Sequence, residues 1–129
     1  MASRTKKGEA GNEGIRRGKE HWFAAMRWRR TVEGELKSVG LTFTQWLVLE
    51  ATQDVSDEAD GAVNQSAVAR YLELDRMTVS QVMRTLERQR MVHREPAARP
   101  PAFRLVVTET GKKALSKART RLRTLKSAS

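Results

Sequence analysis

The sequence lacks several features, and each absence excludes a class of protein. No cysteine occurs among the 129 residues, so disulfides, thiolate metal sites and thiol-based redox sensing within this chain are excluded. No apolar run approaches the roughly 20 residues that a membrane-spanning helix needs. The polar segment Met1–Gly14 has no apolar signal-peptide core. We therefore expect a cytoplasmic protein whose length corresponds to one ordinary domain.

Residue types that carry chemistry are also scarce. The only histidines are His21 and His93, and neither is well placed to share a metal ion with a neighbouring ligand. No serine has a histidine and aspartate beside it that indicates a catalytic triad, and no glycine-rich phosphate loop is present. We therefore expect no metal, no cofactor and no catalytic residue.

Positive charge is abundant and unevenly distributed. The chain carries 25 Lys and Arg against 15 Asp and Glu, a net charge of +10. Residues 41–75 are acidic, whereas residues 76–129 hold fourteen of the basic residues and three of the acidic ones. A polyanion such as nucleic acid is the natural partner of the basic block. The alternatives are a solvated basic surface and, with less support because no strongly apolar face accompanies the charge, a membrane surface.

The first third of the chain predicts a tail followed by a long helix. Residues 1–14 are polar with spaced glycines, so we expect a disordered basic tail. Apolar residues recur at helical spacing over about residues 15–38, and Gly40 is a helix-ending signal. We interpret residues 15–40 as an N-terminal dimerisation helix, because its aromatic side chains exceed what one side of a small domain needs: Trp22, Phe23 and Trp28.

Three further helices are predicted between residues 41 and 90. Thr42 or Thr44 can cap a buried helix from Gln45 to about Asp54, followed by an acidic turn and a very short strand at Ala62–Val63. Asn64 is a good cap for a helix over 65–73. Asp75 can cap a helix over 76–90, whose apolar residues follow the spacing of one helix face: Val79, Val82, Met83 and Leu86.

Strands and a last helix complete the chain. Strand character at 91–94 and 103–107 flanks a segment with three prolines, which predicts a hairpin. Thr108 can then cap a basic helix to about Lys126. The predicted fold is mainly α with a small β-hairpin. It is a winged helix-turn-helix lobe at 41–108, flanked by N- and C-terminal dimerisation helices, the second at 109–129.

The helix that Asp75 caps is the candidate DNA-binding element. It must pack one face on the core and can offer the other to a DNA major groove. Short or polar residues near its start suit base edges, and later arginines suit phosphates. The alternative is that these side chains form a solvated helix face. The candidate residues on this helix are Arg76, Met77, Thr78, Ser80, Gln81, Arg84 and Arg88.

Five segments in order resemble the MarR family of bacterial winged helix-turn-helix regulators. They are LTFTQWLVL at 41–49, QSAVARYL at 65–72, LDRMTVS at 74–80, LERQRMV at 86–92 and VTETG at 107–111. The resemblance implies a homodimer, most simply a repressor, that binds a pseudo-palindromic double-stranded DNA operator. It implies that Gln65 and Ser66 touch the DNA backbone, and that the wing carries Arg94, Arg99 and Arg104.

Two positions depart from the family pattern. The family often has arginine where this chain has Gln81, and glutamine pairs bidentately with adenine whereas arginine favours guanine. Family wings usually carry an Asp-x-Arg element in which the aspartate braces the arginine. Here Arg99 and Pro101 occupy that place, so that brace is missing.

The sequence is also compatible with other functions. The family often binds small phenolic or anionic effectors, and Trp22, Trp28 and Trp46 are candidates to line such a pocket. The alternative is that these rings belong to the core or the dimer interface. A second hypothesis is an architectural DNA-binding protein with little sequence preference and no effector. A third is an enzyme or protein-interaction module that reuses the fold.

Overall fold

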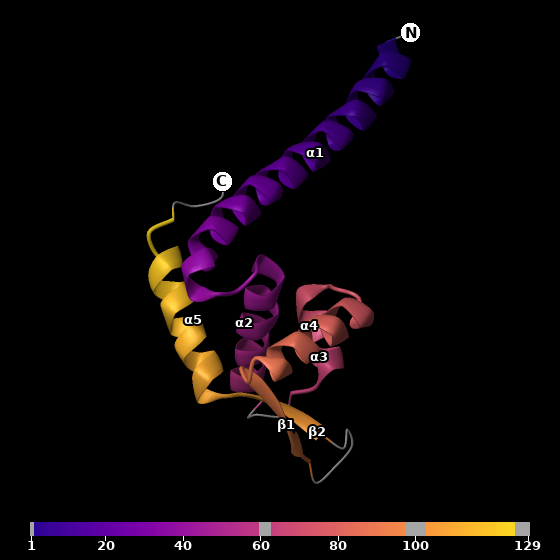
Figure 1. The fold of residues 1–129 in the computed structure, drawn as a ribbon. Coiled ribbons are helices and arrows are strands. Elements are labelled where there is room, and N and C mark those ends of the chain that lie inside the picture. Colours follow the sequence, from indigo (N-terminus) through magenta and orange to yellow (C-terminus); the bar gives the residue numbers. More distant parts are fainter. Residues whose placement is uncertain (1, 60–62, 98–102, 126–129) are drawn as a thin grey trace.

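A computed structural model describes residues 2–59, 63–97 and 103–125, with the side chains of residues 2–10 left undescribed. A long helix, α1, is followed by a short 3-10 turn, three helices, a hairpin and a last helix (Figure 1). The elements are α1 (Ala2–Leu36), η1 (Lys37–Val39), α2 (Phe43–Glu58), α3 (Gln65–Leu72), α4 (Arg76–Arg88), β1 (Val92–Pro96), β2 (Phe103–Val107) and α5 (Glu109–Leu122).

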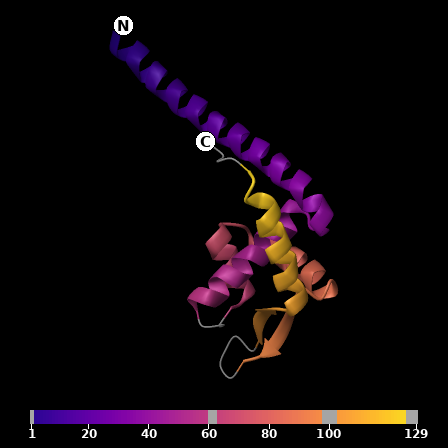
Figure 2. The ribbon, with the colours of Figure 1, turned by 90° about the vertical axis from the view of Figure 1, so that its left-hand side faces the viewer.

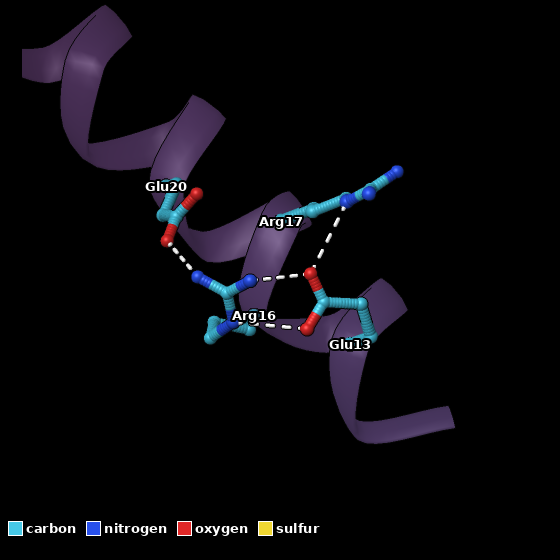
Figure 3. A network of polar contacts seen from close by, with 4 residues as sticks. All are labelled: Glu13, Arg16, Arg17 and Glu20. Carbon is cyan, nitrogen blue, oxygen red and sulfur yellow. Dashed lines mark hydrogen bonds and ion pairs between the residues drawn. The ribbon is translucent and has the colours of Figure 1, made fainter. Parts of the chain in front are cut away.

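Helix α1 projects from the rest of the molecule as a straight arm (Figures 1 and 2). It begins at Ala2, so the structure differs from the disordered tail expected for residues 1–14. Ion pairs between residues three and four apart stabilise a polar helix without apolar burial. Arg16 pairs in this way with Glu13 and Glu20, and Arg17 with Glu13 (Figure 3). The hydrogen bond from Arg16 to Glu13, followed by the charge of Glu20, raises the Arg16 pKa.

Helix α2 begins at Phe43, two residues before the predicted start at Gln45, and ends later than predicted. Thr42 caps it in a capping box with Gln45, with bonds of 3.2 and 3.1 Å. The helix continues to Glu58 rather than ending near Asp54. The additional turn buries Val55 against the core, which offsets the acidic composition that predicted a turn.

One hydrophobic core joins α2, α3, α4, the hairpin and α5. Its centre is formed by fully buried aliphatic side chains, among them Val48, Leu49, Val68, Met83 and Leu86. A smaller cluster joins the end of α1 to α2 and α5 through Val32, Leu36, Phe43 and Ala118. Arg119 of α5 also donates to Glu50 of α2 at 2.9 Å. The last helix therefore connects the arm to the body.

The hairpin has an antiparallel register in which Val92 faces Val107 and Pro96 faces Phe103. The first strand starts one residue later than expected and includes Pro96, which lies at the last pair of the ladder where a missing N–H costs least. A short strand was expected at 62–63, of which residue 62 lies outside the described residues. Val63 O accepts a hydrogen bond of 2.8 Å from Leu105 N of β2. Within the described residues, no helix is long and apolar enough to cross a membrane.

Candidate DNA-binding interface

Helix α4 has two chemically distinct faces. Val79, Met83 and Leu86 are fully buried, so this face holds the helix on the core. The other face is exposed and basic or polar at four of its five positions: Arg76, Met77, Gln81, Arg84 and Arg88. Met77 is the exception, an apolar side chain that is 71% exposed. This face can meet the edges of bases with its first turns and phosphates with its last.

The start of α4 is fixed by its cap. Asp75 accepts from the backbone N–H of Thr78 at 2.9 Å and from the Thr78 hydroxyl at 2.6 Å. The side-chain bond from Thr78, followed by the backbone bond, lowers the Asp75 pKa, so the carboxylate is kept charged at the helix N-terminus. Thr78 is therefore engaged with its own cap, although the sequence predicted it as an outward contact.

Two further predicted contacts differ in their surroundings. Ser80 is half-buried, and Arg84 Nη2 lies 3.4 Å from its hydroxyl oxygen. Glu87, three residues after Arg84 on the same helix, accepts a hydrogen bond from Arg94. Gln65 and Ser66 lie half-buried in the first turn of α3, directly after the cap Asn64. Among the predicted contact residues of α3 and α4, the exposed side chains therefore all lie on α4.

The wing is the hairpin, and its stem, the paired strands β1 and β2, carries charged side chains that form ion pairs within the protein. Arg94 Nε donates to Glu87 on α4 at 2.8 Å, which ties the first strand to the end of that helix. Arg104 Nε and Nη2 donate to one oxygen of Glu95 at 3.1 and 2.7 Å. His93 Nε2 lies 2.9 Å from the other oxygen. The His93 contact, followed by the Arg104 bond, lowers the Glu95 pKa.

Sequence reasoning missed the roles of Glu87 and Glu95. The available signal was that these are the only acidic residues between Arg76 and Arg104. Their partners follow from the strand register, which the sequence leaves open. Arg99, the third predicted wing residue, lies outside the described residues.

The junction between wing and last helix is the third feature of the interface. Thr108 caps α5 by accepting from Gly111 N at 3.1 Å, and its hydroxyl donates to the carbonyl of Arg90. Thr108 N donates to Met91 O at 3.0 Å. A side chain on Gly111 would meet Met91 O at 2.3 Å. Close backbone approach at this point therefore sets the position of the wing relative to α4.

The tryptophans predicted to line a pocket separate into two places. Trp28 and Trp46 pack with Phe43, with ring centroids 5.6 to 6.3 Å apart in the three pairs. Trp22 lies further along the arm and is 61% exposed. The packed rings support a core role for Trp28 and Trp46. The Trp46 Nε1 atom, however, is buried with no hydrogen-bond partner in the described part of the chain.

The helix pair α3–α4, the hairpin that follows it and the basic face of α4 define the class: this is a winged helix-turn-helix lobe. The sequence model of the MarR family matches residues 39–100. That stretch is therefore similar to the MarR family, in agreement with the resemblance of the five sequence segments.

Solved structures of the same type cover more of the chain. A mutant of Escherichia coli MarR complexed with operator DNA has a TM-score of 0.75 at 16% identity, covering 86% of this chain and 76% of that one. The Staphylococcus aureus MepR–DNA complex has a TM-score of 0.66 at 20% identity, covering 82% of this chain and 80% of that one. Mycobacterium tuberculosis MosR has a TM-score of 0.64 at 25% identity, covering 81% of this chain and 72% of that one. None of the curated proteins matches the chain.

Proposed function

We propose that this protein is a sequence-specific transcription regulator that binds a pseudo-palindromic double-stranded DNA operator as a homodimer and acts as a repressor in the cytoplasm. The observation that carries the proposal is the exposed face of α4, where arginines and a glutamine stand opposite a fully buried face. The DNA complexes solved for similarly folded proteins support the choice of partner. The proposal assigns no catalytic role to the chain.

Selection of bound sequences from random DNA tests this function directly. We expect one enriched palindromic motif, bound at least roughly a thousandfold more tightly than random DNA. An architectural DNA-binding protein would enrich no motif, although its affinity would also fall with salt. The same experiment gives the half-site spacing, which reports the geometry of the dimer.

Gln81 provides a sharper prediction within that experiment. Its side chain is exposed on the second turn of α4, and glutamine recognises adenine through two hydrogen bonds. We expect selection with Gln81→Arg protein to replace an A·T pair by a G·C pair at one position of each half-site. Preferences elsewhere in the motif should stay the same. Unchanged preference at every position would show that Gln81 does not reach a base.

The proposal extends to release from DNA by a small aromatic or anionic effector. Its support is the buried Trp46 Nε1, which lacks an acceptor in the described part of the chain and lies beside Trp28 and Phe43. A ligand carboxylate could accept this hydrogen, and such a charge-assisted bond is worth about 1.5–3 kcal/mol. Regulation also requires that the ligand favour the form that does not bind DNA.

Benzoate is a suitable probe because it joins an aromatic ring to a carboxylate. We expect calorimetric titration to show binding that weakens about tenfold in Trp46→Phe, which keeps a ring but removes the donor. Trp22→Phe is the matched control, since Trp22 lies outside the ring cluster, and should bind benzoate like the wild type. Equal affinity in all three proteins, or none in the wild type, would exclude this site for an effector of that chemistry.

A further inference from the structure

The wing stem has an inner and an outer face. Side chains alternate along a strand, and opposite residues of paired strands share a face. The inner face holds buried Val92, Leu105 and Val107. The outer face holds His93 and Glu95 of β1, and Arg104 lies directly opposite Glu95 on β2. This outer trio is part of the hairpin that lies at the opposite end of the molecule from the start of α1 (Figure 1).

Within this trio, Glu95 is held at both of its oxygens. One oxygen accepts two hydrogen bonds from Arg104, and the other contacts His93. A carboxylate fixed at both oxygens restricts the guanidinium that it binds. Arg104 then needs less ordering when it meets a further acceptor, because its rotamer is already limited.

The pairing leaves most of the Arg104 guanidinium free. An arginine side chain has five N–H donors, and Glu95 engages one on Nε and one on Nη2. Within the described residues three donors remain, and the Arg104 side chain is 46% exposed. Arg94 differs because its partner is Glu87 on α4, so that pair joins the strand to the helix.

From this geometry we infer that Glu95 is a positioning residue, which holds Arg104 so that the guanidinium enters the minor groove beside the operator half-site. The inference rests on the proposed DNA-binding function. It places the brace on paired strands of the wing stem, whereas the family pattern has an aspartate two residues before its arginine. Arg104 recognises the narrow, electronegative groove of A·T-rich DNA, where inserted arginines are stabilised.

A simpler role for Glu95 predicts the opposite change in operator affinity when Glu95 is removed. If Glu95 only neutralised the wing, its removal would add positive charge and tighten binding to every DNA. If Glu95 positions Arg104, its removal weakens binding to the operator while binding to random DNA stays equal or tightens. The ratio of the two affinities therefore separates the roles, and a general change of stability does not alter that ratio in this way.

The experiment measures the affinity of the full chain for its selected operator and for random DNA. We expect Glu95→Gln and Glu95→Ala to bind the operator about three- to tenfold more weakly, in the range of a lost charge-assisted bond. Arg104→Ala should lose about tenfold and lower the salt slope by about one phosphate contact. Glu95→Ala combined with Arg104→Ala should lose no more than Arg104→Ala alone, because the two residues act as one unit.

Glu109→Gln is the matched control, since it removes one carboxylate from an exposed side chain of α5 outside the wing. It should not lower the ratio of operator to random affinity. Thermal unfolding of each variant shows that it is folded. Operator binding by Glu95→Gln and Glu95→Ala as tight as that of the wild type, or tighter, overturns the positioning role alone. A wild-type protein that selects no operator overturns the proposed function and this inference with it.

Discussion

Replacing Gly111 by alanine should destabilise the protein by about 1–3 kcal/mol, the usual cost of inserting a methyl group into a filled space. The new Cβ would lie 2.3 Å from the carbonyl oxygen of Met91 and 2.8 Å from a methyl carbon of Val107. The Met91 oxygen belongs to the backbone and already accepts from Thr108 N. It therefore has little freedom to move away.

The consequence reaches the DNA-binding surface because Met91 joins α4 to β1. A shift of this segment changes the position of the wing relative to α4, so the variant should also bind the operator more weakly than its stability alone predicts. Urea unfolding at one fixed protein concentration measures the first effect. Titration of operator DNA well below the unfolding transition measures the second.

Gly34→Ala is the matched control for this substitution. Gly34 lies in the interior of α1, and a Cβ there meets nothing within 4 Å. Alanine should stabilise that position by about 0.5–1 kcal/mol, since glycine is unfavourable inside a helix. The two identical substitutions should therefore have opposite signs. A Gly111→Ala protein as stable as Gly34→Ala would show that the close contact at Met91 is relaxed in solution.

Combined substitution of Trp22 and Phe23 by aspartate should convert the protein to a monomer and weaken operator binding by at least about a hundredfold. These rings are 61% and 54% exposed on the projecting arm, and Ile15, at 60%, lies seven residues before Trp22 on the same side of α1. An exposed apolar face of this kind indicates a protein interface. A second copy of the chain is the partner that the proposed homodimer provides.

The expected loss of affinity follows from the two half-sites of a palindrome. A dimer that binds one half-site presents its second lobe to the other half-site at a high effective concentration, which raises affinity by about 10² to 10⁴. A monomer loses this gain without losing any contact of α4. Analytical ultracentrifugation measures the oligomeric state, and titration with whole and half operators measures the affinity.

Thr31→Asp is the control for added negative charge on the same helix. Thr31 is exposed on α1, and in the part of the chain that the structure describes its hydroxyl bonds only to the backbone of its own helix. This variant should remain dimeric and bind the whole operator like the wild type. A Trp22 and Phe23 double variant that sediments as a dimer would place the interface elsewhere on the chain.

Much of the lobe could be predicted because its signals are local. Asn64, Asp75 and Thr108 each cap a helix by accepting from a backbone N–H three residues later. Such bonds need only the neighbouring residues, so a cap followed by helical apolar spacing predicts both the start and the buried face of α4. The left-handed Gly40 that ends η1 is another local signal.

Predictions from local composition were wrong where other interactions outweighed it. Polar residues with spaced glycines predicted a tail at 1–14, but the helix begins at Ala2. Acidic residues predicted that α2 ends near Asp54, but burial of Val55 extends it to Glu58. In each case, the preferred structure of a short segment depends on partners outside that segment.

By itself, the sequence determined the class of protein: helix caps, apolar periodicity and the basic last block together define a winged helix-turn-helix with an exposed basic helix face. Only the tertiary structure decided which charges pair between different elements. Glu95 meets Arg104 because of the hairpin register, and Glu50 meets Arg119 across 69 residues of chain because α5 packs on α2. Caps and periodicity act within one or two helical turns, whereas these pairs exist only after strands align and helices pack.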